Sequence, residues 1–326
     1  MSGTRTAPLE PAREVPVRYA DVHVVTVTHN SVSTLEDWLT GIARSVSAVR
    51  GVTVVDNGST DDTVARLRRL AAASEVPVEV IENHNAGFAG GYAAAAASTV
   101  TRGLPVLCLN PDVSLAPGAV DAMVAVLNRH PDAAVATVPL VEVDGSPDTA
   151  SRRRLPTLGA SMVYSVLGRL TPAGLRYNRR AAEDAVVRAS PGSDERASVL
   201  EATTGAVMLV APDFRTLDEG VFDQDYWMYG EDLQLCADAR TAGRVVLIAE
   251  VPPSVHVKGV SSGRPRSTRS NRAFHDAMLQ YARKNLVSAP PLVAALRVAV
   301  EAHFLLTELR AVPVRARRRR AATTPA

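Results

Sequence analysis

Cysteine and aromatic residues are scarce in this chain. Cys108 and Cys236 are the only cysteines among 326 residues, too few for a disulfide framework or a thiolate zinc site, so the chain fits a reducing cytoplasm. Aromatic residues make up 4% of the chain, which makes three of them within residues 226–229 conspicuous. No stretch approaches about 18 uninterrupted apolar residues, and we therefore predict no membrane-spanning helix.

We also expect no signal sequence, and the net charge is small. The first 20 residues contain no apolar core and are expected to form a flexible lead-in. The formal charge is +2, and five arginines lie within residues 315–320, so the remainder carries −3 and we expect no nucleic-acid partner. A length of 326 residues leaves one large domain with appendages or two small domains open.

Apolar runs alternate with helix-like segments from residue 22 to about residue 138. The expected strands are 22–30, 51–60, 76–83, 104–113 and 133–138, followed later by 201–212 and 244–251. Helices are expected from near Ser33, after a cap at Thr60, over 87–99 and from Pro117. Continuous apolar strands separated by helices predict an α/β fold with a mostly parallel central sheet covered on both faces.

Polar motifs follow the ends of the expected strands, where ligands bind in open α/β sheets. They are Thr-His-Asn at 28–30, the segment 56–61, the segment 82–87 and Asn-Pro-Asp at 110–112. Asp56 is placed to reach a ribose hydroxyl or a heterocycle N–H. An ordinary turn with Asp56 as a local cap is the competing interpretation.

Asn110 and Asp112 place two side-chain oxygens beside Pro111. One carboxylate together with substrate phosphates is a common way to hold Mg²⁺ or Mn²⁺, although a type I turn would have the same residues. His256 follows a late strand and is a candidate metal ligand or pyrophosphate contact, with a structural histidine as the alternative. The arginines at 152–154 would meet an anionic substrate or form a solvated charge run.

The second half of the chain is less regular. Residues 141–200 are rich in turn formers and predict an insertion or acceptor-side region with an exposed loop near 183–197. A helix is expected to begin near Glu231 and end at Gly243. Residues 292–310 form an apolar helix followed by the arginine run, which suits either an anionic membrane surface or packing on protein.

Six motifs in this order resemble glycosyltransferase family 2, whose members have the GT-A fold. They are VVDNGSTD, NAGFAGGY, LNPDV, TGAVMLV, FDQDYWMYGEDLQLCADARTAG and VHVKGVSS. The resemblance covers roughly residues 22–285 and is greatest to bacterial and actinobacterial rhamnosyltransferases, including decaprenyl-diphospho-GlcNAc rhamnosyltransferases. It implies inverting, metal-assisted transfer of a sugar from a nucleotide-diphosphate donor, with Mg²⁺ or Mn²⁺ as cofactor.

The resemblance also implies roles for individual residues. Donor contacts are expected from Thr28, Asn30, Asp56, Asn57, Asn85, Gly87 and Asn110, and metal contacts from Asp112 and His256. Asp232 would be the general base, with Glu231 beside it. Acceptor contacts are expected from Arg153, Tyr226, Trp227 and Tyr229.

Elementary chemistry supports the role of Asp232. An inverting displacement needs a carboxylate that takes the proton of the acceptor hydroxyl, and a helix N-terminus favours the ionised form. Aromatic rings nearby would stack on sugar faces and exclude water. Asn110 stands where many relatives carry Asp, and this predicts a modest metal affinity.

The expected substrates are dTDP-L-rhamnose and a polyprenyl-diphosphate-linked or polysaccharide acceptor. UDP-galactofuranose or a UDP- or GDP-hexose as donor, and a non-catalytic nucleotide-sugar-binding scaffold, remain alternatives. The expected organisation is a lead-in at 1–20, a catalytic domain at 21–285 with donor (21–140) and acceptor (141–285) halves, and a helix with basic tail at 286–326. We expect a cytoplasmic protein at the inner face of the membrane and leave a homodimer open.

Overall fold

A nine-stranded sheet forms the centre of the described part of the chain. The computed structural model describes residues 18–44, 49–98, 103–159, 187–189, 196–257 and 266–322. The strand order is β3 (Val78–Asn83), β2 (Val49–Asn57), β1 (Val22–Thr28), β4 (Val106–Leu109), β10 (Val207–Val210), β6 (Ala133–Thr137), β11 (Val245–Ala249), β9 (Arg196–Leu200) and β8 (Val187–Ala189).

Most of the central strands run parallel, as the buried apolar runs predicted. Strands β3, β2, β1 and β4 pair in parallel, and so do β6 and β11. Strand β10 lies antiparallel between β4 and β6, and β9 and β8 continue the sheet antiparallel beyond β11. The expected strand 104–113 is interrupted, because Asn110, Pro111 and Asp112 form a turn between β4 and the short strand β5 (Val113–Ser114).

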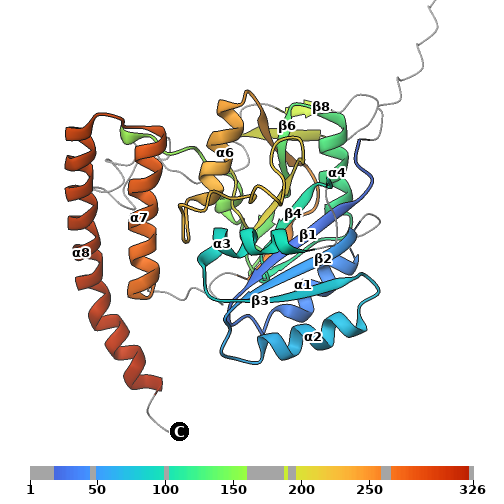
Figure 1. Cartoon of the computed structure of the whole chain (residues 1–326), viewed down its shortest axis with the longest axis horizontal. Coiled ribbons are helices and arrows are strands. Elements are labelled where there is room, and N and C mark those ends of the chain that lie inside the picture. Colours follow the sequence, from blue (N-terminus) through green and yellow to red (C-terminus); the bar gives the residue numbers. More distant parts are fainter. Residues whose placement is uncertain are drawn as a thin grey trace, which may run out of the picture.

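Helices cover both faces of the sheet (Figure 1). On one face, α1 (Leu35–Arg44), α2 (Thr63–Ala73) and α4 (Ala119–Arg129) bury apolar side chains such as Trp38, Leu67 and Met123. On the other face, α3 (Gly87–Ala94) and α6 (Glu231–Thr241) contribute Tyr92 and Leu235 to a second apolar cluster. The hydrophobic residues, 46% of the chain, thus supply an apolar cluster on each face of one sheet.

The expected cap at Thr60 is wrong. Helix α2 begins at Thr63, and Asp62 occupies the N-cap position without a side-chain hydrogen bond. Thr60 instead donates its backbone N–H to the side-chain oxygen of Asn30, at 2.8 Å. This hydrogen bond from Thr60 therefore connects the loop before α2 to the loop after β1.

A second, three-stranded sheet joins distant parts of the chain. Strand β12 (Ser254–His256) pairs in parallel with β7 (Leu140–Val141) and antiparallel with β5. His256 is the last residue of β12 and lies opposite Val113. This pairing brings His256 next to the Asn-Pro-Asp turn, 144 positions earlier at Asp112.

A helical hairpin of α7 (Thr268–Asn285) and α8 (Pro290–Ala322) stands beside the sheet domain, at the left of Figure 1. Helix α8 is longer than the expected 292–310, because it begins at Pro290 and continues through the arginine run. Its inner face forms ion pairs and hydrogen bonds with α7: Arg272 pairs with Glu301, and Asn271 donates a hydrogen bond to Glu308. Protein packing thus accounts for one face of α8.

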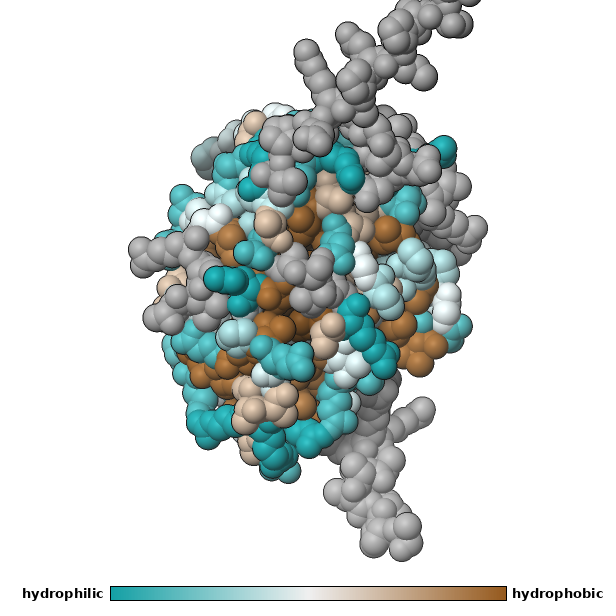
Figure 2. All heavy atoms as spheres, turned by 90° about the vertical axis from the view of Figure 1, so that its right-hand side faces the viewer, coloured by the Kyte–Doolittle hydropathy of each residue, from teal (hydrophilic) through white to brown (hydrophobic). Residues whose placement is uncertain are grey.

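The outer face of α8 is apolar and exposed. Val298 and Leu309 are each 70% exposed, and the other large apolar side chains on this face are Leu292, Leu305, Leu306 and Val312. Among the described residues outside α8, only Val32 and Val143 are exposed large hydrophobics. On the side away from the hairpin, hydrophilic and hydrophobic residues are interspersed (Figure 2).

In the described residues, no helix combines the length and the hydropathy needed to cross a bilayer. Several expectations lie outside these residues. They concern the lead-in up to residue 17, the loop residues 183–186 and 190–195, and the end of the VHVKGVSS motif.

Two histidines meet inside the hairpin. His275 is 1% exposed, and its Nδ1 lies 2.8 Å from the carbonyl oxygen of Asn271, which can only accept, so Nδ1 carries the proton. Nε2 then accepts a hydrogen bond from Nδ1 of His303, at 2.9 Å. Burial lowers the pKa of His275, and the charges of Arg266 and Arg272 lower it further.

The hairpin should lose stability on acidification. His275 is neutral in the fold and its pKa is below the unfolded value of about 6.5, so below that pH the unfolded chain binds an extra proton and the free energy of unfolding falls. Urea unfolding at pH 7.5 and pH 5.5 measures this difference. We expect His275→Gln to reduce it and His84→Gln, at an exposed site, to leave it unchanged; equal pH dependence in both variants would contradict the assignment.

Candidate active site

The ends of β1 and β2 lie side by side, because Thr28 pairs with Asp56 in the parallel register. Asp56 is 2% exposed. Its Oδ1 accepts hydrogen bonds from the hydroxyls of Thr28 and Ser59, at 2.9 and 2.5 Å, and its Oδ2 accepts from the backbone N–H of Ser59 at 2.8 Å. The two contacts with Ser59 are those expected if Asp56 caps the local turn that follows β2.

Asparagine side chains connect the neighbouring loops. Asn30, in the left-handed region with a φ of 53°, binds the loop before α2. Asn57 donates to the carbonyl of Gly87 at 2.7 Å, and Asn85 accepts from the Gly87 N–H at 3.2 Å. The structure therefore brings the six residues expected to contact the donor between positions 28 and 87 to one edge of the sheet, while Asn110 follows β4.

Gly87 makes the closest approach in this region. Its φ is 84°, and a Cβ at this position would lie 2.0 Å from the carbonyl oxygen of Trp227. The same oxygen accepts a hydrogen bond from the Phe88 N–H at 2.7 Å. Only glycine fits here, and this contact fastens the 222–230 segment to the first turn of α3.

The Asn-Pro-Asp turn faces His256. Nε2 of His256 lies 3.5 Å from Oδ1 of Asp112, and Nδ1 lies 2.8 Å from a carboxylate oxygen of Asp148. Asp148 is 1% exposed, and its other oxygen accepts from the Ala150 N–H. Sequence reasoning missed Asp148, because it lies 108 positions from His256 and its Ser-Pro-Asp context signals only a turn.

The donor set of this turn fits a divalent cation that keeps open positions. Oδ1 of Asn110 is buried and has no hydrogen-bond partner among the described residues, and Oδ1 of Asp112 is buried with Nε2 of His256 3.5 Å away. Asp148 orients the imidazole of His256 through Nδ1, as a carboxylate commonly does for a histidine ligand, and leaves Nε2 toward Asp112. No group of three or more His, Cys, Asp or Glu side chains placed to hold a metal occurs in the described chain, so substrate oxygens would complete the coordination.

The two carboxylates beside His256 also control its charge. Burial disfavours the imidazolium, but hydrogen bonds and charges from Asp112 and Asp148 outweigh this effect and raise the pKa of His256 to about 9. A cation bound between Asp112 and His256 would replace the proton on Nε2, because a ligating imidazole nitrogen must be deprotonated.

Asp232 is the second residue of α6 and is held on three sides. Its Oδ2 accepts from Arg153 at 2.8 Å and from the Gly205 N–H at 3.0 Å, and its Oδ1 accepts from the Leu233 N–H at 2.8 Å. The carbonyl oxygen of Ala206, next to Gly205, accepts a hydrogen bond from the backbone N–H of Asn110 at 2.9 Å. Two adjacent backbone groups thus connect Asp232 with the Asn-Pro-Asp turn.

Glu231 has a different environment from its neighbour. It is 6% exposed, and Oε2 has no hydrogen-bond partner among the described residues. Burial raises its pKa to about 8, and the charge of Asp232 adds to this effect. At neutral pH Glu231 is therefore mainly protonated.

The backbone before α6 is strained. Tyr229 has a φ of 69° and Gly230 a φ of 83°, two consecutive left-handed residues directly before Glu231. A non-glycine residue in this region costs about 1–3 kcal/mol, and such strain is concentrated at functional sites. The Tyr229 hydroxyl lies 2.7 Å from the Ser270 hydroxyl, and its ring packs edge-on against Phe274 of α7.

The three expected acceptor-side aromatics differ in exposure. Tyr226 is 2% exposed, its hydroxyl donates to Gln234 at 2.9 Å, and it lines the pocket between residues 225–228 and α7. Trp227 and Tyr229 are half-buried. Trp227 carries the guanidinium of Arg269 over its ring, 4.2 Å from the centroid.

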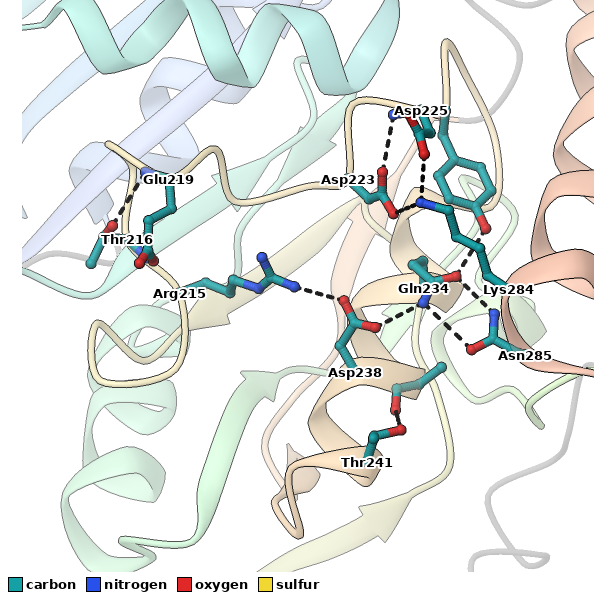
Figure 3. A network of polar contacts seen from close by, with 12 residues as sticks. Arg215, Thr216, Glu219, Asp223, Asp225, Gln234, Asp238, Thr241, Lys284 and Asn285 are labelled. Carbon is teal, nitrogen blue, oxygen red and sulfur yellow. Dashed lines mark hydrogen bonds and ion pairs between the residues drawn. The ribbon is translucent and has the colours of Figure 1, made fainter.

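The acidic residues before α6 bind α7 and stabilise the loop (Figure 3). Lys284 pairs with both Asp223 and Asp225, and the Asp225 contact measures 2.7 Å. Below them, Gln234 accepts from Asn285 at 2.8 Å and donates to Asp238 at 2.7 Å. The carboxylates of 222–232 therefore divide into loop anchors and the Glu231–Asp232 pair.

Comparison with known proteins identifies the class of fold. The solved structure of GalNAc-T7 with UDP, GalNAc and Mn²⁺ superposes with a TM-score of 0.59 at 14% identity, over 82% of this chain and 48% of that one. The mannosyltransferase PcManGT from Pyrobaculum calidifontis, in complex with GDP-Man and Mn²⁺, gives 0.51 at 20% identity, over 97% and 80%. The chain spans about half the length of the GalNAc-T7 chain, and at these identities the likeness establishes the expected GT-A fold alone.

Sequence comparison then identifies the family. The model described as Glycosyl transferase family 2 matches residues 23–184. An N-acetylglucosaminyl-diphospho-decaprenol L-rhamnosyltransferase of Mycobacterium tuberculosis is 27% identical over 258 residues, covering 74% of this chain and 77% of the relative. The chain belongs to glycosyltransferase family 2, as the order of its motifs predicted.

The Gly87 contact predicts a stability difference between two glycines. Gly87→Ala should lower the free energy of unfolding by about 2–4 kcal/mol, because left-handed strain adds to a clash with the Trp227 carbonyl. Gly118→Ala is the matched control: its φ is 75°, but nothing lies within 4 Å of a Cβ there, so about 1–2 kcal/mol is expected. Urea unfolding measures both, and equal losses would contradict the close approach.

Proposed function

We propose that this protein is an inverting glycosyltransferase that moves L-rhamnose from dTDP-L-rhamnose to a polyprenyl-diphosphate-linked or polysaccharide acceptor. The observation that carries the proposal is the link through Gly205 and Ala206 between the Asp232 carboxylate and the Asn-Pro-Asp turn. A base and a cation-binding turn held by one rigid segment are what an inverting transfer requires. The rhamnose assignment is supported by the mycobacterial relative, an L-rhamnosyltransferase at 27% identity.

Asp232 acts as the general base in this proposal. The guanidinium of Arg153 and two backbone N–H groups stabilise its carboxylate form. The base takes the proton of the acceptor hydroxyl as the oxygen attacks the anomeric carbon, and the bond from that carbon to the diphosphate breaks. Arg153, expected to contact the acceptor, would instead position Asp232. Glu231, which is buried and whose pKa burial raises to about 8, would support α6.

Asp112 and His256 would hold Mg²⁺ or Mn²⁺ together with the donor diphosphate. The cation would neutralise the charge that develops on the departing nucleoside diphosphate. Asn110 would contribute an amide oxygen in place of a second carboxylate, and the charge on the protein side is then lower by one. Thr28, Asn30, Asp56, Asn57, Asn85 and Gly87 would enclose the nucleoside at the ends of β1 to β3.

The outer face of α8 supports a location of the protein at a membrane surface. An apolar stripe of Val298, Leu305, Leu309 and Val312 precedes the arginines at 317–320 on the same helix. Such a helix would lie on the anionic inner surface of the cytoplasmic membrane, where each basic residue near the surface adds about 1 kcal/mol. A lipid-linked acceptor would reach the enzyme in the plane of that membrane.

A donor panel tests the activity. With Mg²⁺ or Mn²⁺ and a decaprenyl-diphosphate-linked acceptor, dTDP-L-rhamnose should release dTDP, and EDTA should stop the release. UDP-galactofuranose and UDP- or GDP-hexoses test the alternative donors. Binding of a nucleotide sugar without release of any nucleoside diphosphate would favour the non-catalytic scaffold.

Two neighbouring isosteric substitutions test the base. Asp232→Asn should lower turnover by about 10²–10⁴-fold, the contribution typical of a positioned base, with donor affinity nearly unchanged. Glu231→Gln is the matched control, because glutamine imitates the protonated acid that is present at neutral pH. We therefore expect its turnover to fall by less than about tenfold. A fully active Asp232→Asn enzyme, or a larger loss in Glu231→Gln, would refute the assignment.

Liposome flotation tests the membrane contact. Leu305→Ser with Leu309→Ser should reduce binding to anionic vesicles at all salt concentrations, because apolar burial is lost. Deleting residues 316–326 should remove only the salt-sensitive part of binding. This deletion keeps Arg315, which pairs with Glu308 at 2.7 Å and stabilises the hairpin. Unchanged binding in both variants would support a second protein chain as the partner of this face.

A further inference from the structure

A cavity of about 690 Å³ lies between the 225–228 segment and the α7–α8 hairpin. This volume is within the range of small-molecule sites. Its walls include the apolar side chains of Trp227, Met228, Ala273, Ala277 and Phe304. None of the residues assigned to the nucleotide or the cation lines it, so it is separate from the donor site.

The segment that forms one wall of the cavity also reaches the donor side. The Trp227 carbonyl accepts from the Phe88 N–H, directly after Gly87, while the Trp227 side chain lines the cavity. Four residues further along the chain, Glu231 begins α6 and Asp232 follows. A molecule bound in the cavity is therefore adjacent in structure to the segment that presents the base.

The charges around the cavity leave one cation without an anionic partner. Asp225 pairs with Lys284, at 2.7 Å. Arg272 pairs with Asp276 at 2.8 Å and forms two hydrogen bonds to Glu301. Arg269 is exposed and stacks on Trp227, and no carboxylate of the described residues pairs with it.

Apolar walls and one unpaired guanidinium define the chemistry of the occupant. A neutral sugar would not use the charge of Arg269, and a simple inorganic anion would not use the Met228 and Phe304 surfaces. An aliphatic chain that ends in a phosphate or diphosphate would use both, because guanidinium binds phosphate oxygens and apolar walls bind methylene and methyl groups. Phe304 is contributed by the inner face of α8, where its ring contacts Arg272 and His275 of α7.

We propose that this cavity binds the phosphorylated end of a prenyl-type lipid, with Arg269 on the diphosphate and Met228 and Phe304 on the first isoprene units. The proposal rests on the proposed function, since it specifies where the lipid part of the acceptor lies. It assigns Arg269 a role in acceptor affinity and none in donor binding or in the displacement.

Trp227 supplies a direct readout of binding. The chain has two tryptophans, and Trp38 is 1% exposed in the sheet core, so an emission change on adding a ligand to the cavity should come from Trp227. Geranyl diphosphate is the probe, with inorganic pyrophosphate, geraniol and N-acetylglucosamine as comparators. We expect saturable quenching by geranyl diphosphate, much weaker binding of the comparators, and no response in Trp227→Phe.

Arg269→Ala should weaken geranyl diphosphate binding by about tenfold or more, the usual effect of losing a charged hydrogen bond. Arg283→Ala is the matched control, because Arg283 is an exposed arginine of the same helix that does not line the cavity. Equal affinities in the two variants, or quenching by N-acetylglucosamine and not by geranyl diphosphate, would overturn the proposal.

Kinetics separate this proposal from the proposed function. In an active enzyme, Arg269→Ala should raise KM for the lipid-linked acceptor at least several-fold and leave KM for the donor unchanged; an unchanged acceptor KM overturns the cavity assignment alone. A protein that binds geranyl diphosphate through Arg269 but neither binds nor cleaves any nucleotide sugar would overturn the proposed function and support the cavity assignment.

Discussion

The backbone at Gly205 and Ala206 is the constraint on which the site depends. Ala206 accepts the N–H of Asn110 as β4 ends, and Gly205 donates to Asp232 as α6 begins. The segment leads directly into β10, the antiparallel strand between β4 and β6, and its residues are almost fully buried. A buried sheet strand has little freedom, so the distance between the Asn-Pro-Asp turn and the Asp232 carboxylate is set by the core.

A second contact connects the loops after β2 and β3 to the 222–230 segment. Asn57 donates to the Gly87 carbonyl, and the next N–H in the chain, from Phe88, donates to the Trp227 carbonyl. The absence of a side chain on Gly87 permits this sequence of contacts. The end of β2 is therefore connected through Gly87 and Phe88 to Trp227, which lines the cavity beside α7.

Much of the fold could be predicted because buried strands have an unmistakable sequence pattern. The runs at β1, β2, β4 and β6 are continuous apolar segments between turn formers, and each formed a strand within a few residues of its expected bounds. Helix ends were less certain. Thr60 has a residue type that commonly caps helices, but its backbone N–H donates to the side chain of Asn30 instead. Asn30 lies 30 positions away, so a local sequence pattern could not predict this contact.

The site was predictable only in part, for the same reason. The polar residues at the strand ends could be named because parallel strands bring their carboxyl ends to one edge. The identity of their partners could not: Asp148 reaches His256 through the small sheet of β5, β12 and β7, which pairs segments more than 100 positions apart. Tyr226 and Trp227 are adjacent, similar in type and both line the cavity, yet Tyr226 is 2% exposed and Trp227 is half-buried, a difference that residue type alone does not predict.

The two carboxylates at the start of α6 show how a single helix turn can produce two chemical states. Both lie at the same helix N-terminus, so the dipole alone cannot distinguish them. Arg153 and two N–H groups supply the partners of Asp232, whereas Glu231 enters apolar surroundings with one oxygen unmatched among the described residues. Burial and the charge of Asp232 then favour the protonated form of Glu231.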